Sequence, residues 1–283
     1  MISDDEVRRI SRRLRDLVEP LAANVYFAPE GQENYKALGL SYIPSYFRSR
    51  SACMGDVTGE VVVATFGVFN PAIVLPAIEE GRKVSVDDIL DARQRGAIAG
   101  LTRILEGVPD GVDRATELLK RAGDACTCEG HSIYAGLRSL GFPGDPVGDF
   151  WRAADLVREH RGDSHIIAWT SHDVDAVEVT LLTELWWRLP LKAYVGTRGW
   201  TPDEIDAGIN RLIERGLIEG EEFTSTGEQL RASIEEATDR QERRVVEALG
   251  EDADELLSIL EPWSKAVVAS GGYPSDPSSL TRP

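Results

Sequence analysis

The sequence predicts a mainly α-helical protein with one short pair of strands in its C-terminal half. Apolar residues recur at the spacing of an amphipathic helix along most of the chain. Ser, Thr and Asp stand before several of these segments as candidate N-caps, and glycines follow them as candidate C-caps. Periodicity therefore gives the fold class, and capping gives the boundaries of the elements.

The N-terminal part is expected to consist of amphipathic and buried helices. A helix over residues 4–24 carries apolar residues on one face and arginines on the other, namely Arg8, Arg9, Arg12, Arg13 and Arg15. Residues 26–47 alternate aromatics, prolines and glycines, which favours short helices joined by tight loops. Residues 56–80 are almost uncharged and have strand propensity in places. No partner strand is visible nearby, so we predict two buried helices that break near Asn70-Pro71.

The middle of the chain contains well-marked helices and one loop-rich stretch. Ser85 is the expected cap of a helix over 85–107, and a second helix follows over about 110–122. Glycines and prolines are frequent in residues 123–147, which mark a domain boundary or a long functional loop.

Gly162 is expected to interrupt the helical region that follows. A helix over about 148–160 would end at Arg161-Gly162, and Asp163 would cap another helix over 164–172.

The elements after residue 173 follow the order of a winged helix. A helix over 174–189 precedes one that starts at Thr201-Pro202 and stops at Gly216. The segment 217–223 is typical of a short hairpin-like wing. A long helix is then expected to about residue 248, and a last one over 252–269.

These elements divide the chain into an N-terminal helical domain with an aromatic-rich pocket, a C-terminal winged-helix domain with a short β-wing, and a disordered tail. The parts span residues 1–147, 148–270 and 271–283.

Two stretches of the winged-helix region carry a resemblance to a known family. The run Ile209-Asn210-Arg211-Leu212-Ile213-Glu214-Arg215-Gly216-Leu217-Ile218 resembles the recognition helix and wing entry of the MarR family, and Thr224-Ser225-Thr226-Gly227 stands where that family has its Leu-Thr-x-x-Gly turn. The whole chain also resembles actinobacterial helix-turn-helix family proteins. This second resemblance rests on Val25-Tyr26-Phe27-Ala28-Pro29-Glu30, Ala37-Leu38-Gly39-Leu40, Tyr46-Phe47-x-x-Arg50, residues 158–165 and Glu236-Ala237-Thr238-Asp239. It implies a two-part helical fold and no particular activity.

The charge pattern argues against DNA as the partner. The net charge is -17, which repels phosphate backbones and lipid headgroups. Acidic residues dominate the recognition helix and wing: Asp203, Glu204, Asp206, Glu214, Glu219, Glu221 and Glu222. Only Arg211 and Arg215 oppose them, whereas a typical DNA-binding protein makes about six or more phosphate contacts. The N-terminal arginines are either a substitute basic patch or a solvated helix face paired with acidic neighbours.

Several other classes of function lose support. No apolar run is long enough to cross a membrane, and the acidic start does not match a secretory signal. The three cysteines are too few for a disulfide framework, so a cytoplasmic location is expected. P-loop, G-x-G-x-x-G, G-x-S-x-G and H-E-x-x-H motifs are absent, and we expect no cofactor.

The segment 158–165 is the sharpest cluster of candidate catalytic residues. A turn at Gly162 would let His160 and His165 face one cavity, with Asp163 orienting either ring. Such an arrangement suits proton transfer. The alternative is a structural corner, in which Asp163 is an N-cap and the arginines form surface ion pairs.

Cys126, Cys128 and His131 form a C-x-C-x-x-H run that offers metal ligands. A structural zinc site also needs a fourth ligand, and its cysteines are usually spaced C-x-x-C. We therefore expect no metal and interpret the segment as a loop with incidental thiols.

An aromatic group with charged residues beside it is the candidate ligand pocket. Its expected members are Tyr26, Glu30, Tyr42, Tyr46, Phe47 and Arg50, together with Arg158 from the later segment. Tyrosines next to charges are costly to bury without partners, so a pocket is one use for them and core packing is the other.

Three hypotheses on function follow. The first is a repurposed winged-helix protein that binds a small organic metabolite between its N-terminal helices and the 150–172 segment. The second is an enzyme of small-molecule metabolism on the same scaffold, and the third is a ligand-responsive MarR-like regulator. The first and last helices are expected to pair, either within a monomer or across a homodimer.

Overall fold

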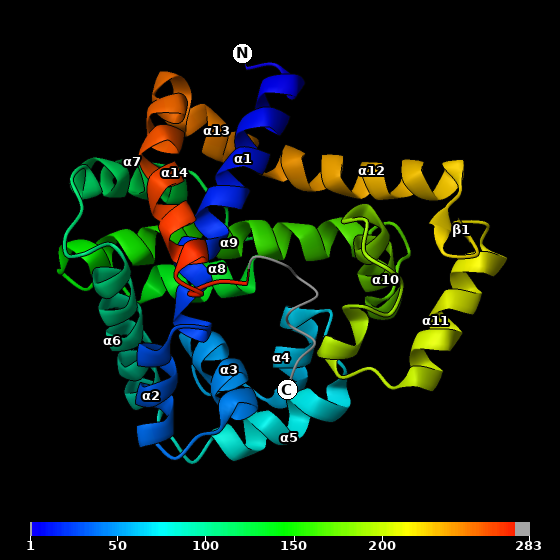
Figure 1. The fold of residues 1–283 in the computed structure, drawn as a ribbon, viewed down its shortest axis with the longest axis horizontal. Coiled ribbons are helices and arrows are strands. Elements are labelled where there is room, and N and C mark those ends of the chain that lie inside the picture. The colour runs from blue at the N-terminus through cyan, green and yellow to red at the C-terminus, as the bar shows by residue number, and fades with distance from the viewer. Residues whose placement is uncertain (1, 275–283) are drawn as a thin grey trace.

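The computed structural model describes residues 2–274 and has the predicted mainly α-helical fold (Figure 1). In chain order, the α-helices are α1 (Asp4–Ala23), α2 (Pro29–Ala37), α3 (Tyr42–Ser51), α4 (Gly59–Phe66), α5 (Pro71–Gly81), α6 (Val86–Ile104), α7 (Val112–Asp124), α8 (Ser132–Ser139), α9 (Pro146–Thr170), α10 (Ala176–Trp186), α11 (Pro202–Glu214), α12 (Ser225–Gln241), α13 (Arg243–Leu249) and α14 (Ala253–Ala269). The strands β1 (Ile218–Glu219) and β2 (Glu222–Phe223) pair in antiparallel register, which confirms the predicted short pair of strands, called the wing below.

Capping explains why several elements lie where the sequence places them. The Ser3 hydroxyl accepts the backbone N–H of Glu6 at the start of α1, and Ser85 caps α6 in the same way. Thr201 and Glu204 form a capping box that opens α11. The predicted break near Asn70-Pro71 separates α4 from α5, as expected.

The helix α9 is continuous, so the predicted break at Gly162 is wrong. A glycine inside a helix costs only about 1 kcal/mol relative to alanine, and the buried surface of α9 outweighs that cost. Asp163 caps a different helix from the one expected. Its carboxylate accepts the backbone N–H groups of Ile133 and Tyr134, at 3.0 and 3.2 Å, which are otherwise unpaired donors at the start of α8.

The helix expected to run to about residue 248 is divided into α12 and α13 at Glu242. The buried Glu242 carboxylate is directed toward α9, where it accepts a hydrogen bond from Ser164.

Helix α9 lies at the centre of the molecule and packs against α1, α6, α7, α8 and α12. Its first half belongs to the main hydrophobic core, where Trp151 is fully buried and donates its indole N–H to the carbonyl of Ala22 at 3.0 Å. Its last turn enters a second core made with α10, α11 and α12. Figure 1 shows α10, α11 and the wing at one side of the molecule, with α9 and α12 leading toward them. The division of the chain at residue 147 stays a prediction.

The two ends of the chain pack together in one molecule. Helix α1 lies along α14, and Leu256 and Leu260 of α14 are fully buried in the core to which α1 contributes. Ion pairs join Arg9 to Asp254 at 2.9 Å and Arg13 to Glu261 at 3.1 Å. The pairing of the terminal helices is therefore satisfied within the chain.

The prediction of a disordered tail from residue 271 falls mostly on residues 275–283, which lie outside the described residues. The described part of that segment is packed. Tyr273 makes an edge contact with Phe27, with 5.5 Å between ring centroids, and Asn24 donates to the carbonyl of Gly272 at 3.0 Å.

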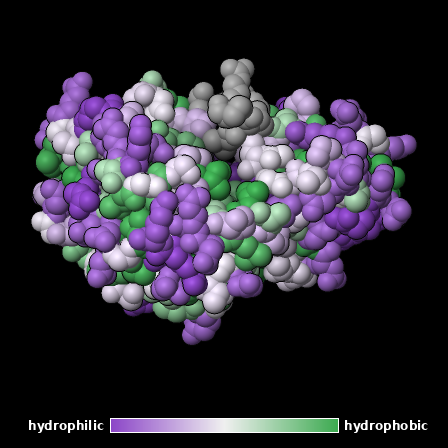
Figure 2. Space-filling view, turned by 90° about the horizontal axis from the view of Figure 1, so that it is seen from below, coloured by the Kyte–Doolittle hydropathy of each residue, from purple (hydrophilic) through white to green (hydrophobic). Residues whose placement is uncertain are grey.

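In the described part of the chain, no helix is long and apolar enough to cross a membrane. Figure 2 shows hydrophilic side chains over much of one face, with smaller apolar areas between them.

Candidate functional site

A cavity of about 600 Å³ lies between α1, α9, α10, α12 and the connection from α10 to α11. Its lining combines apolar, aromatic and charged side chains. The aromatic members are Trp186, Trp187, Tyr194 and Tyr273. The charged members are Arg15, Arg50, Arg158, Arg161, Arg198 and Arg231, with Asp16, Glu19, Glu159, Glu235 and Glu242. A cavity of this size and composition is suited to a small organic molecule.

Only part of the predicted ligand site lines this cavity. Arg50 and Arg158 do, as expected. Tyr26 and Phe47 are core residues that are at most 1% exposed. Tyr46 packs among Tyr26, Phe47 and Phe66 rather than lining the cavity. Of the other two predicted members, Glu30 forms an ion pair with Arg103, and Tyr42 is 44% exposed.

Arg50 and Arg158 are held by the buried carboxylate of Glu159. Arg50 binds both carboxylate oxygens, with Nε and Nη2 at 2.8 and 2.7 Å. Arg158 donates to Glu159 at 2.6 Å and to both oxygens of Glu19 at 2.8 and 3.0 Å. Burial alone would raise the pKa of Glu159, but the two arginines outweigh it and hold that pKa at about 2. The two arginines and the two glutamates therefore have no net charge together.

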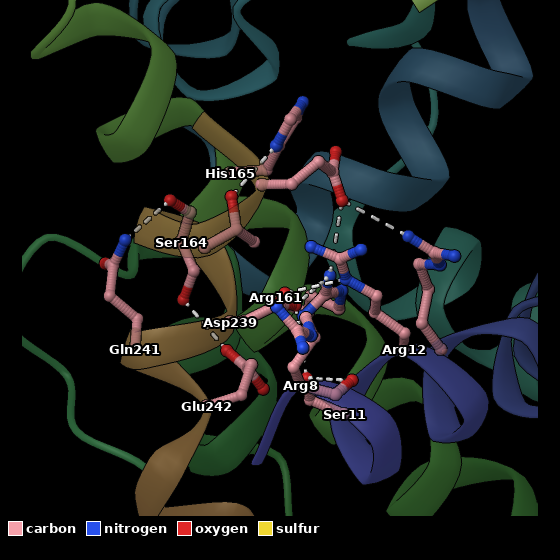
Figure 3. Close-up of polar contacts among 12 residues, drawn as sticks. Arg8, Ser11, Arg12, Arg161, Ser164, His165, Asp239, Gln241 and Glu242 are labelled. Carbon is pink, nitrogen blue, oxygen red and sulfur yellow. Dashed lines mark hydrogen bonds and ion pairs between the residues drawn. The ribbon is translucent and has the colours of Figure 1, made fainter. Parts of the chain in front are cut away.

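A second network crosses the other wall of the cavity and joins α1, α9 and α12. Figure 3 shows Asp239 of α12 between Ser11 and Arg12 of α1 and Arg161 of α9. The donor distances to its carboxylate are 3.1, 2.7 and 2.9 Å respectively. One turn earlier on α12, Glu235 accepts Arg231 at 2.6 Å. Arg15 and Arg161 also lie within 4.0 Å of Glu235.

The predicted catalytic residues do not come together. Because α9 is continuous, His160 and His165 point to different sides of it. His165 lines the cavity and bonds through Nδ1 to the Thr238 hydroxyl at 3.1 Å. Burial and then the positive charge of Arg231 lower its pKa to about 4, so its imidazole is neutral near pH 7.

His160 and Asp163 lie behind the cavity wall. The His160 ring stacks on His131 with 4.1 Å between centroids, and its Nδ1 lies 2.9 Å from Glu242. Ser164 links Glu242 to Nε2 of His131, with contacts of 3.0 and 2.9 Å. Burial, reinforced by Glu159, raises the pKa of Asp163 to about 7. This side of α9 is a buried polar layer that holds α8 and α12.

The connection between α10 and α11 spans residues 187–201 and supplies one wall of the cavity. The buried Glu184 carboxylate organises it by accepting the backbone N–H groups of Lys192, Tyr194 and Val195 at 2.8, 2.5 and 2.6 Å. Burial raises the pKa of Glu184 to about 7. The turn of a simple helix-turn-helix has about three or four residues, so this longer connection contributes surface that such a turn lacks.

Sequence reasoning missed Trp186, Trp187, Tyr194, Arg198 and Arg231 as cavity residues. The Trp-Trp pair lies near the end of the helix expected over residues 174–189. The sequence signal for these cavity residues is the grouping of an arginine with aromatic residues in a long connection between two helices.

The candidate metal ligands do not gather around one point. Cys126 is buried with its thiol near the Ala122 carbonyl, Cys128 is exposed, and both ring nitrogens of His131 have partners. Over residues 2–274, no group of three or more His, Cys, Asp or Glu side chains is arranged to hold a metal ion.

The arginines of the helix-turn-helix region are paired with acidic side chains. Arg211 lies 2.6 Å from Asp175 and 3.4 Å from Glu178, and Arg215 lies 2.7 Å from the same glutamate. The N-terminal arginines are also paired, through Asp5, Asp254, Asp239, Glu261, Asp16 and Glu235. These contacts match the interpretation of a helix face paired with acidic neighbours.

Comparisons with curated proteins and with solved structures found no match. The model of a family described as the helix-turn-helix family matches residues 11–274. That range contains the residues that line the cavity as well as the helix-turn-helix elements, and it leaves out only residues 2–10 of the described chain. The chain therefore belongs to the helix-turn-helix family.

Proposed function

We propose that this protein binds a small organic molecule in the cavity between α1, α9, α10 and α12, and that it does not bind DNA. The cavity is the observation that carries the proposal. Its volume of about 600 Å³ lies within the range of small-molecule sites, about 300–1,000 Å³. Trp186, Trp187 and Tyr194 offer apolar contact, and the arginines and glutamates offer polar contacts that would fix orientation.

The charge of the helix-turn-helix surface supports the second part of the proposal. Arg211 and Arg215 already face carboxylates, so phosphate contacts would have to replace existing ion pairs. The acidic residues of the wing, Glu219, Glu221 and Glu222, are exposed. A phosphate backbone approaching this surface meets net repulsion.

A cavity-filling variant tests the ligand proposal. Thr183 of α10 lines the cavity, and its hydroxyl bonds the Val179 carbonyl at 2.7 Å. We expect Thr183→Trp to fold and to lose the thermal shift that the wild type shows with members of a small-metabolite panel. Thr170→Trp is the matched control, because Thr170 is exposed and makes the same bond to the carbonyl four residues earlier, at 2.7 Å. Equal thermal shifts in both variants would overturn the proposal.

DNA binding is tested separately by gel shift at low salt. We expect no salt-sensitive complex with duplex DNA from upstream of the coding region. A nanomolar complex that weakens steeply with salt would favour the MarR-like regulator instead.

A catalytic role on this scaffold would rest on His165. Of the three residues predicted to transfer protons, it alone lines the cavity, and it is a neutral imidazole able to accept a proton. His160 and Asp163 would then only support the wall. Loss of turnover in His165→Gln, with turnover retained in His160→Gln, would favour the enzyme.

We propose a monomer in the cytoplasm. Pairing of α1 with α14 inside the chain and the free thiols of Cys53, Cys126 and Cys128 support this. Light scattering is the test of assembly, and a mass near twice that of the 31.1 kDa chain would instead indicate the homodimer.

A further inference from the structure

Arg198 differs from the other arginines that line the cavity. Arg50 and Arg158 are paired with Glu159, Arg231 with Glu235, and Arg161 with Asp239. Arg15 likewise contacts Asp16 and Glu235. Among the residues that the structure describes, no carboxylate lies within 4.0 Å of the Arg198 guanidinium. The cavity therefore has one cation whose charge the described residues leave uncompensated, in a chain with a net charge of -17.

The position of Arg198 is fixed by its neighbours. Its backbone carbonyl accepts the N–H of Asn70 at 2.8 Å, which ties it to the start of α5. Its guanidinium lies over the ring of Tyr194 at 4.2 Å and over the ring of Phe69 at 4.8 Å. Aromatic faces hold a guanidinium plane and leave its edge to donate hydrogen bonds elsewhere.

The surroundings of Arg198 are short of hydrogen-bond acceptors. Its Nε is buried and has no hydrogen-bond partner in the described part of the chain. Burial lowers its pKa, and the nearby positive charge of Arg50 acts in the same direction. A guanidinium stays charged under such conditions, so an anion that reached Arg198 would offset part of the cost of its burial.

We infer that the ligand of this cavity is an aromatic or apolar monoanion whose carboxylate or other oxyanion group pairs with Arg198. The inference rests on the proposed function, since it names the chemical class of the ligand in the same cavity. The anionic group would bind the edge of the guanidinium in a bidentate manner. The apolar body would lie toward Trp186 and Trp187, and the second of these already packs edge-on to Tyr194 at 5.4 Å.

The test uses two fluorescent probes that share one aromatic skeleton. 1-Anilinonaphthalene-8-sulfonate is an anion, and N-phenyl-1-naphthylamine is its neutral counterpart. Both are titrated into the full-length wild type, Arg198→Gln, Arg198→Lys and Arg240→Gln. Arg240 is exposed on α12 and does not line the cavity, so its variant makes the same change of charge away from the site.

Arg198→Gln is expected to weaken binding of the anionic probe about tenfold or more, because a charged hydrogen-bond donor is lost. Binding of the neutral probe should change less than about twofold, which also shows that the cavity is intact. Arg198→Lys should retain part of the affinity for the anion, and Arg240→Gln should match the wild type. Equal loss of both probes in Arg198→Gln, or an unchanged affinity for the anion, would overturn the inference while leaving the cavity as a binding site. Failure of the wild type to bind either probe would overturn the proposed function itself.

Discussion

The helix-turn-helix surface and the cavity wall both contain arginines, but they differ in what remains after ion pairs form. On α11 and the wing, Arg211 and Arg215 are paired and the remaining charge is acidic and exposed. Around the cavity most arginines are paired too, yet Arg198 keeps a positive charge that the described carboxylates do not meet. The helix-turn-helix surface thus repels anions, whereas Arg198 in the cavity can pair with an anion.

The number of basic residues on a surface therefore says less about anion binding than the number that lack a carboxylate partner. The same residue type serves as structural cross-link in one place and as candidate ligand group in another.

Asp239→Ala should cause the greatest loss of stability. It removes the carboxylate that joins Ser11 and Arg12 to Arg161 and leaves Arg161, which is 8% exposed, without its close partner. Breaking a buried ion pair in this way costs about 3 to 5 kcal/mol. Urea unfolding followed by circular dichroism measures it. A loss below about 1 kcal/mol would mean that these arginines are not structural cross-links.

Glu184→Gln should loosen the connection that carries Tyr194 and Arg198. The Glu184 carboxylate accepts three backbone N–H groups, and an amide has only one oxygen to replace its two. We expect a stability loss of about 1 to 3 kcal/mol and weaker binding of the anionic probe. Hydrogen exchange of residues 190–198 should rise. Unchanged exchange there would show that another contact holds the connection.

His165→Gln should change how stability depends on pH. The pKa of His165 is about 4 in the folded protein, below the ordinary value of 6.5. Between pH 6.5 and pH 4 the unfolded chain takes up a proton that the folded protein does not. The stability that depends on a neutral His165 is therefore complete above pH 6.5 and is lost as pH falls toward 4.

We expect the wild type to lose about 2 kcal/mol more than His165→Gln over that interval. Asp163 acts in the opposite direction, because its raised pKa favours the folded state as pH falls from about 7. The difference between the two proteins isolates the histidine. Parallel pH profiles would contradict its assignment as a neutral buried base.

The double variant Glu214→Lys and Glu222→Lys should have the smallest effect on stability, within about 0.5 kcal/mol, because both side chains are exposed. It also tests whether the acidic residues of the helix-turn-helix surface are what prevents DNA binding. If acidity alone prevents DNA binding, weak complexes that disappear with added salt should form. No complex at low salt would indicate that the paired arginines cannot be released.

The sequence predicted most of the fold because periodicity and capping are local signals. Ser3, Ser85 and Thr201 start their helices as expected, and the wing follows α11. The break at Gly162 was predicted wrongly because the partner that uses Asp163 lies about 30 residues away on α8. When the capping side chain comes from another helix, the residues next to it in the sequence do not show which helix it caps.

The site was harder to predict because it depends on which side chains face a shared space. Arg50 and Arg158 were identified from their charge, but Tyr26 and Phe47 proved to be core residues. Arg198 and Tyr194 come from a connection whose single short 3-10 helix, Val195–Arg198, is too short to show an apolar period in the sequence. Their role depends on how that segment folds back over α9 and α10.

Hydrogen exchange with mass spectrometry, with 1-anilinonaphthalene-8-sulfonate and with duplex DNA added in parallel, tests the central claim most directly. Binding slows exchange where the ligand lies, so one readout covers both surfaces. We predict that the anionic probe protects residues 179–200 and 157–165 and that DNA protects no region. Protection of residues 202–223 by DNA, with none around the cavity from the probe, would contradict the account.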